Sequence, residues 1–178
     1  EQILAGIAPE SKEDRENLLA TLKTSKEKEN PSILVMIAGF EAQNGHLEDA
    51  FNNTNKALKK RPKVTGFILM KANLLTSLGE IEETQKWLAK SSRRHRDNLD
   101  VRLAEARFLI RHSEPQLALK KLEDIIKMWP DNEDAKFIAG LTSIDLKYYE
   151  KAEQYLVDLR YSAKYQNDAY YYLAVNAE

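Results

Sequence analysis

The sequence repeats itself at intervals of 34 residues, and this period restricts its fold more than any other feature. Gly45 and Gly79 occupy the same position in successive units. Small residues recur in one column at this spacing, namely Ala38, Ala72, Ala106, Gly140 and Ala174. A second small-residue column contains Ala50, Thr84, Ala118 and Ala152. Agreement between several columns predicts a tandem array of one small structural unit.

Further columns indicate that each unit is a pair of helices. Apolar residues recur at Ile33, Phe67, Val101, Ala135 and Ala169, and at Met36, Met70, Ala104, Ile138 and Tyr172. The last positions of successive units include Pro62, Arg96 and Pro130. Small residues let two helices cross closely, Gly tolerates the left-handed conformation that follows a helix, and Pro ends the next helix. We expect the hairpins to stack, because one hairpin cannot bury its own apolar faces.

Paired helices are expected at residues 32–44 and 48–61, 65–78 and 81–94, 99–112 and 115–128, and 133–146 and 149–161. Ser11 with Asp14 predicts the start of an earlier helix, which is expected to end before Pro31. Residues 1–9 have two interpretations: they continue a preceding helix or pack across the N-terminal end. A last helix is expected to begin near Asp168, which would cap it.

These columns resemble the tetratricopeptide repeat (TPR) family over about residues 31–178. The segments from Pro31 to Pro62, from Val101 to Pro130 and from Glu133 to Leu156 match its pattern of small residues and Pro well. The resemblance implies an all-α, right-handed superhelical solenoid of antiparallel helix hairpins, with about four to five repeats. We expect an N-terminal segment and helix at residues 1–30, for which the second half of an earlier repeat is one interpretation. Repeats are expected at 31–64, 65–98, 99–132 and 133–167, and the first helix of a further repeat or a cap at 168–178. The chain is expected to be a fragment of a larger bacterial TPR protein.

A few positions depart from the family's pattern. Thr84 and Arg96 replace the usual Ala and Pro of their unit. Arg102 and Glu105 stand at places that are usually apolar, and the repeat that ends near Asn167 lacks a few residues. These departures affect the expected local register and not the expected architecture.

The composition argues against several classes of function. The formal net charge is −1, with 27 Lys and Arg against 28 Asp and Glu, so the basic excess typical of nucleic-acid binders is missing. No apolar run approaches the roughly 20 residues that span a membrane. The lack of cysteine removes disulfides and thiolate chemistry.

No residue pattern predicts catalysis, a cofactor or a metal site, and we expect a protein that is not an enzyme. His46, His95 and His112 have no ligand partner at a suitable spacing, and neither a phosphate loop nor a nucleophile elbow is present. The basic run from Arg93 to Arg96 has two interpretations. It is either the cationic end of a helix or an anchor for an acidic partner.

The TPR resemblance implies that the first helices of the hairpins line a concave groove that binds another protein or a peptide. The residues expected along this groove are Val35, Leu69, Asn73, Leu103, Arg107, Ile110, Arg111, Phe137, Leu141 and Tyr171. In one interpretation the apolar members pack between adjacent first helices and are buried. In the other, part of the stripe stays exposed to an apolar or amphipathic peptide. Only Asn73 is of a type with which some family members hold a C-terminal carboxylate, so a clamp of that kind is not expected.

All eight tyrosines lie between Tyr148 and Tyr172. Four of them, Tyr149, Tyr155, Tyr170 and Tyr172, are candidates for the hairpin core. We nevertheless expect an exposed aromatic surface at this end of the chain, because Tyr is enriched at interfaces. Such a surface would permit self-association.

The main functional hypothesis is a scaffold or adaptor that binds a partner protein without a cofactor. The alternative is a structural segment of a longer solenoid that mediates oligomerisation or the assembly of an envelope complex. The closing segment, from Asn167 to Glu178, resembles helices of large bacterial TPR proteins, some of which are envelope lipoproteins. That resemblance favours the bacterial envelope or periplasm over the cytoplasm.

Overall fold

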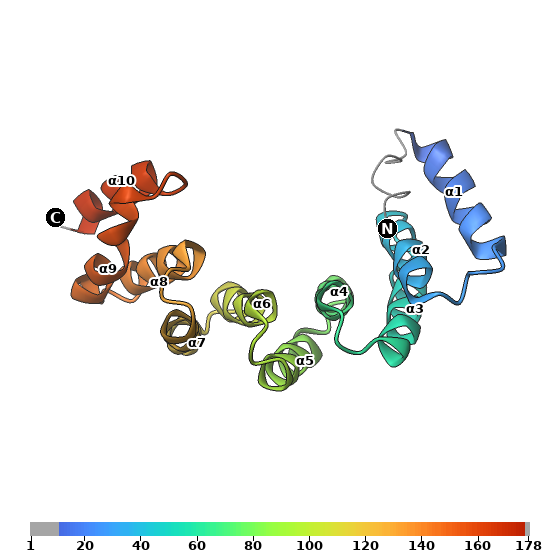
Figure 1. Ribbon diagram of the computed structural model, residues 1–178, viewed down its shortest axis with the longest axis horizontal. Coiled ribbons are helices and arrows are strands. Elements are labelled where there is room, and N and C mark those ends of the chain that lie inside the picture. Colours follow the sequence, from blue (N-terminus) through green and yellow to red (C-terminus); the bar gives the residue numbers. More distant parts are fainter. Residues whose placement is uncertain (1–10, 177–178) are drawn as a thin grey trace. The chain divides into compact units, whose positions relative to one another are not determined.

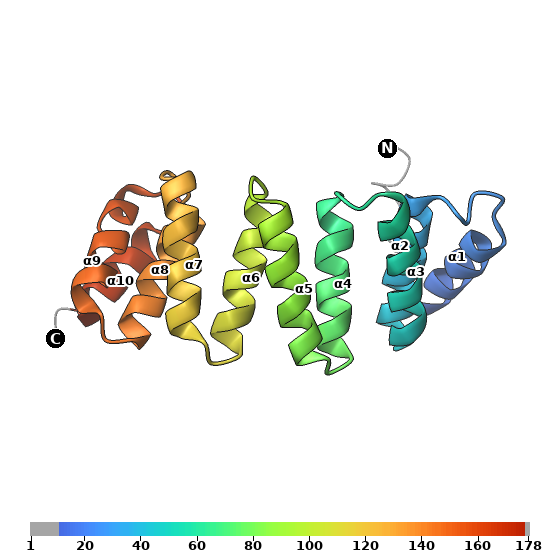
Figure 2. The same cartoon turned by 90° about the horizontal axis from the view of Figure 1, so that it is seen from below.

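The computed structural model describes residues 11–176, and all regular structure in this range is helical. The α-helices are α1 (Lys12–Thr24), α2 (Pro31–Gln43), α3 (Leu47–Lys60), α4 (Thr65–Ser77), α5 (Ile81–Arg94), α6 (Leu99–Arg111), α7 (Pro115–Met128), α8 (Glu133–Asp145), α9 (Tyr149–Leu156) and α10 (Gln166–Asn176) (Figures 1 and 2). A 3-10 helix, η1, covers Asp158–Tyr161. The predicted all-α fold class is confirmed. The two interpretations of residues 1–9 concern a segment outside the described residues.

The paired helices from α2 to α8 begin and end within one residue of the predicted bounds. Polar caps explain several of these starts. Asn30, Asn98 and Asn132 each accept a hydrogen bond from a backbone N–H in the first turn of the helix that follows. Ser11 does the same for α1, as its spacing from Asp14 predicts.

The chain forms two compact units, Glu1–Thr84 and Gln85–Glu178. In the first unit, α1 packs on α2, α2 on α3, and α3 on α4. One core cluster of this unit joins Ala38 of α2, Ala50 of α3 and Leu74 of α4, all of them buried. The two small-residue columns therefore meet inside the hairpin, where the helices cross.

The second unit continues the same order from α6 to α10, each helix packing on the next. One core cluster joins α6, α7 and α8 through residues such as Leu103, Leu122 and Ala139. A second cluster joins Leu156, Leu159 and Ala169 and receives side chains from α8 and α10. The small-residue column reaches its tightest point here: a Cβ added to Gly140 would lie 2.6 Å from Leu156 Cγ and Cδ2.

The predicted helix at residues 149–161 is wrong in its second half, because α9 ends at Leu156 and gives way to η1. Both Leu156 and Leu159 are buried in one core cluster. Leu156 is the last residue of α9 and Leu159 lies in η1, so the core continues across the point where the α-helix ends.

The predicted cap of the last helix is also wrong, since α10 begins at Gln166 and Asp168 lies inside its first turn. Ser162 orders the turn before this helix. Its Oγ accepts hydrogen bonds from the backbone N–H groups of Lys164 and Tyr165, at 3.1 and 3.0 Å. This earlier oxygen orders the turn that leads into the helix.

Candidate functional site

The first helices of the second unit form one continuous wall, made by α6, α8 and α10. Ile110 of α6 packs in the same core cluster as Ala135 and Ala139 of α8. Phe137 of α8 and Tyr172 of α10 share the next cluster. The sequence prediction that first helices lie beside one another therefore agrees with these contacts.

The predicted groove residues of this wall differ in exposure. Arg107, Arg111 and Tyr171 are exposed, whereas Ile110, Phe137 and Leu141 are half-buried. Leu103 is only 5% exposed and belongs to the core beneath the wall. Its contribution is to packing, so the open part of the wall does not include it.

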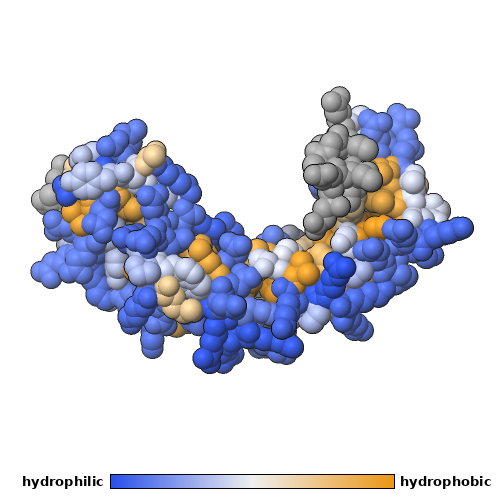
Figure 3. All heavy atoms as spheres, in the orientation of Figure 1, coloured by the Kyte–Doolittle hydropathy of each residue, from blue (hydrophilic) through white to orange (hydrophobic). Residues whose placement is uncertain are grey.

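In the first unit, the corresponding residues lie on α2 and α4. Val35 and Leu69 are half-buried, and Asn73 is exposed. The Met70 side chain of α4 reaches Gly39 of α2, because a Cβ built on Gly39 would lie 3.9 Å from Met70 Cε. Hydrophobic atoms reach the surface over α2 in this unit and over α10 in the other (Figure 3).

Asp134, at the start of α8, organises the charges of the wall. It accepts hydrogen bonds from Lys164 Nζ at 2.7 Å and from Tyr165 Oη at 2.9 Å. Arg107 Nη2 lies 3.8 Å from its Oδ2. The hydrogen bond from Lys164 is the largest cause that lowers the pKa of Asp134 below 3.8, with smaller contributions from Tyr165 and Arg107. The carboxylate thus fixes the turn before α10 against α8.

The same turn covers Phe137, which the sequence places in the open groove. The Tyr165 ring stacks on the Phe137 ring with centroids 4.4 Å apart. Tyr172 meets Phe137 edge to face at 6.1 Å, and Tyr171 meets Tyr172 in the same way at 5.1 Å. Of these four rings, that of Tyr171 is the exposed one.

Five tyrosines of the second unit are exposed, although nothing among the described residues joins all five into one aromatic surface. These exposed tyrosines are Tyr148, Tyr149, Tyr161, Tyr170 and Tyr171, with Tyr161 the most exposed at 83%. Of the four candidates for the hairpin core, Tyr155 and Tyr172 are half-buried. Tyr149 and Tyr170 are exposed, so the expectation that these two lie in the core is wrong. Ala174 is exposed too, although the other four members of its column are buried.

Two buried carboxylates were not identified as paired sites from the sequence. Glu41 is 1% exposed and bonds to Lys23 Nζ and Asn53 Nδ2, both at 2.8 Å. Glu105 is 4% exposed and lies 2.7 Å from Lys121 Nζ. The position of Glu105 in an apolar column could have predicted a buried ion pair, because a buried carboxylate needs a partner. The partner lysine could not be identified, because it belongs to the next helix and has no fixed sequence spacing from Glu105.

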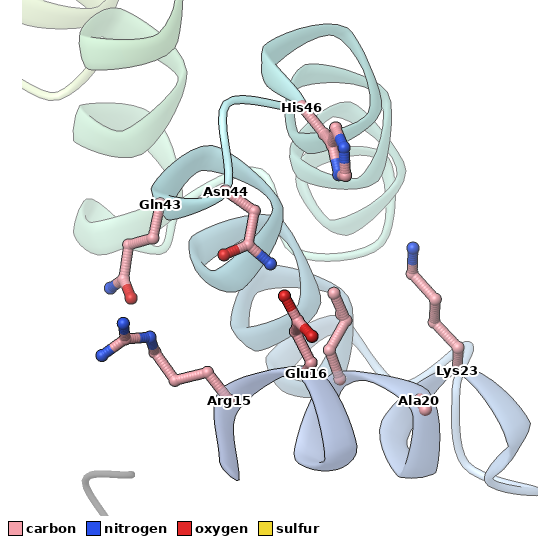
Figure 4. A pocket seen from close by; sticks show the side chains of 8 residues that line it. Arg15, Glu16, Ala20, Lys23, Gln43, Asn44 and His46 are labelled. Atoms are coloured by element: carbon pink, nitrogen blue, oxygen red, sulfur yellow. The ribbon is translucent and has the colours of Figure 1, made fainter. Parts of the chain in front are cut away.

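A hollow of about 580 Å³ lies in the first unit, between α1 and the turn that joins α2 to α3. Figure 4 shows Arg15 pointing toward Gln43 and Glu16 toward Asn44, with Lys23 on the side of His46. Both charge signs line this hollow, and Lys23 is already paired with Glu41. Its chemistry therefore selects no single class of ligand.

The basic run from Arg93 to Arg96 lies at the end of a helix, as the first of its two interpretations expects. Arg93 and Arg94 form the last turn of α5, and Arg93 Nε donates to the Ala89 carbonyl at 3.1 Å. Within residues 11–176, no cluster of three or more metal-ligating side chains occurs. None of the helices described has the length and apolarity needed to cross a membrane.

No family model matches the sequence, and no curated protein matches it either. Solved structures do match. YrrB, described as a TPR protein with an unusual peptide-binding site, is 19% identical, with a TM-score of 0.63 over 88% of this chain and 80% of that one. MamA from Desulfovibrio magneticus RS-1 is 15% identical, with a TM-score of 0.64 over 82% and 84%.

A tetratricopeptide repeat protein from Parabacteroides merdae gives a TM-score of 0.66 at 15% identity, over 92% of this chain and 63% of that one. Identities this low establish the fold and nothing further. Together with the helical hairpins and their 34-residue columns, these likenesses confirm the expected resemblance: the chain has the tetratricopeptide repeat fold.

Proposed function

We propose that this protein is an interaction scaffold that binds a segment of a partner protein along the wall formed by α6, α8 and α10. The observation that carries this proposal is the composition of the wall. Arg107 and Arg111 are exposed on α6, which also carries half-buried Ile110. Half-buried Leu141 lies on α8 and exposed Tyr171 on α10. Arginine and tyrosine are enriched among the residues that dominate protein interfaces.

The wall favours an amphipathic segment with acidic residues. Arg107 is only loosely paired, since its nearest oxygen on Asp134 is 3.8 Å away. A carboxylate of the partner can therefore approach the Arg107 and Arg111 guanidinium groups without breaking a short ion pair. Apolar residues of the same segment would cover Ile110 and Leu141.

A double variant tests this proposal without disturbing the core. Arg107→Glu with Arg111→Glu reverses two exposed charges on α6. The matched control is Lys120→Glu with Lys127→Glu, two exposed charges on α7. Peptides selected from a random library against the wild-type chain supply the probes, and their Kd values are compared across the three proteins.

The proposal expects the α6 variant to bind at least about ten-fold more weakly, because two charge-assisted contacts are lost and two repulsions replace them. The control should bind as the wild type does. Equal affinity for the α6 variant, with helicity retained by circular dichroism, contradicts binding at this wall. Variants at Leu103 or Phe137 are unsuitable, because these side chains belong to core clusters.

Self-association through the C-terminal end is the second candidate function, as part of a longer solenoid in a bacterial envelope complex. It is supported by exposed Tyr170, Tyr171, Ala174 and Val175 on α10. Sedimentation of the wild type and of Tyr171→Ser with Val175→Ser tests it. A concentration-dependent oligomer that dissociates in the variant supports this function, and a monomer at all concentrations contradicts it.

A further inference from the structure

A small cavity of about 210 Å³ lies between α5, α6 and α7, in the second unit. Its sides are largely apolar: Leu88 and Ala89 come from α5, Phe108 and Leu109 from α6, and Leu117 from α7. Leu117 is 39% exposed, which is unusual for a large aliphatic side chain of this protein. The cavity is smaller than the roughly 300 to 1,000 Å³ of sites for drug-sized ligands, and it suits one inserted side chain.

A buried carboxylate gives this apolar cavity a specific polar group. Glu105 lines it and is 4% exposed. Its Oε1 lies 2.7 Å from Lys121 Nζ, and no other described residue bonds to the carboxylate. A carboxylate has about four lone-pair positions, so one lysine leaves acceptor capacity unused. An incoming hydrogen-bond donor would satisfy it.

The rim of the cavity is basic. Arg93 belongs to the lining and is exposed, and its Nε donates to the Ala89 carbonyl. Its terminal Nη atoms bond to no described residue. Gln85, also on the rim, is occupied by a hydrogen bond to Glu114 Oε1 at 2.7 Å. Arg93 is thus the exposed charged residue of the lining, and it favours an acidic neighbour of the inserted side chain.

We propose that this cavity is a second peptide-binding site, which takes a tyrosine or tryptophan side chain flanked by acidic residues. The ring would fill the apolar cavity, its O–H or N–H would donate to Glu105, and the flanking carboxylate would meet Arg93. Buried Tyr and Trp need such a partner for their polar atom. A lysine or arginine is disfavoured, because Arg93 and Lys121 would repel it. This site lies between α5, α6 and α7. It uses residues of α6 other than those that the wall of α6, α8 and α10 presents.

The probes are three blocked tripeptides: Asp-Tyr-Asp, Asp-Phe-Asp and Lys-Tyr-Lys. Binding is followed from the backbone amide signals of the whole chain by NMR. The Asp-Tyr-Asp peptide should shift amides of α5, α6 and α7, and should bind about ten-fold more tightly than Asp-Phe-Asp, because a hydrogen bond to a charged acceptor is lost with the hydroxyl. Lys-Tyr-Lys should bind most weakly.

Matched variants separate this site from general effects on stability. Glu105→Met with Lys121→Met replaces the buried pair by apolar residues of similar length, a change that proteins often tolerate. It should abolish the preference for Tyr over Phe. Glu41→Met with Lys23→Met makes the same change in the first unit, away from the cavity, and should keep the preference. Ala89→Met, which fills the cavity, should remove binding of both peptides.

Three results would overturn the proposal. The first is equal affinity for the Tyr and Phe peptides in the wild type. The second is the absence of shifts in α5 to α7 at about 10 mM peptide, well above a millimolar Kd. The third is a preference for Tyr that survives in the Glu105 and Lys121 variant. The Arg107 and Arg111 variant should leave binding of Asp-Tyr-Asp unchanged, so failure here and failure of the wall are distinguishable.

Discussion

The turn inside each hairpin has the same backbone in both units but different residues. Gly45 and Gly79 of the first unit have φ values of +83° and +79°, and Ser113 and Lys147 of the second have +61° and +60°. In all four turns the next residue donates its N–H to a carbonyl five residues earlier, at 2.8 or 2.9 Å. That bond defines the Schellman motif. The fold therefore imposes the left-handed conformation even where the residue resists it.

The two units also differ in the residues at their helix crossings. The first unit has buried Ala38 and Ala72 in this column. The second unit has buried Ala106 and then Gly140, where an added Cβ would lie 2.6 Å from Leu156. The first unit is thus built from residues that suit the repeat, and the second carries more local departures from it. All eight tyrosines and the short α9 also belong to the second unit.

The largest expected effect is at this crossing. Gly140→Ala should destabilise the protein by about 2 kcal/mol, because overpacking costs up to about 3 kcal/mol and the better helix propensity of Ala returns about 1 kcal/mol. Urea unfolding measures the change. In the double variant Gly140→Ala with Leu156→Ala, the clash is absent, so the two effects should be non-additive. Additive effects would show that the two side chains do not compete for space.

Removing the lysine that pairs with a buried carboxylate should destabilise the second unit nearly as much as Gly140→Ala does. Lys121→Met leaves Glu105 with no bonded partner and should cost about 2 kcal/mol, less than the 3 to 5 kcal/mol of a fully buried pair because the lysine is partly exposed. Lys23→Met should cost about 1 kcal/mol, because Asn53 still donates to Glu41. Equal losses in urea unfolding would contradict this difference between the units.

Substitutions at the hairpin turns should change the stability less, and in opposite directions in the two units. Ser113→Gly and Lys147→Gly should each stabilise the protein by about 0.5 kcal/mol, because the left-handed conformation costs an L-residue more than the added flexibility of Gly costs the unfolded state. Gly45→Ser and Gly79→Ser should destabilise it by about the same amount. Thermal unfolding of the four variants compares them directly. Destabilisation by Ser113→Gly would mean that its side chain, not its backbone, matters.

The smallest effect concerns Asp134 of the second unit. Its pKa in the folded protein is below the ordinary value of 3.8, chiefly through the hydrogen bond from Lys164. Its contribution to stability is therefore present above about pH 3.8 and is lost as the pH falls through the lower, folded value. Asp134→Asn should reduce stability at pH 7 by a few tenths of a kcal/mol, since the pair is largely solvated. The difference in stability between the variant and the wild type should shrink as the pH falls below about 3.8 in urea unfolding.

Much of the candidate site could not be predicted from the 34-residue repeat columns. Arg107 and Arg111 could be placed on the open face of a first helix from their register, and the structure keeps them exposed. The cover on Phe137 could not be predicted, because Tyr165 lies in an irregular turn whose path is set by Asp134 and Ser162. The cavity at Glu105 also escaped the sequence, since three separate helices form it.

The 34-residue columns alone predict the paired helices from α2 to α8 and the turns inside their hairpins, because small, apolar and capping residues act through local geometry and through contacts between neighbours in the chain. The pairing of polar groups and the exposure of aromatic rings follow instead from the three-dimensional packing. Those outcomes depend on the exact positions of side chains from different helices. A shift of a few ångströms, invisible in any repeat pattern, makes or breaks a hydrogen bond.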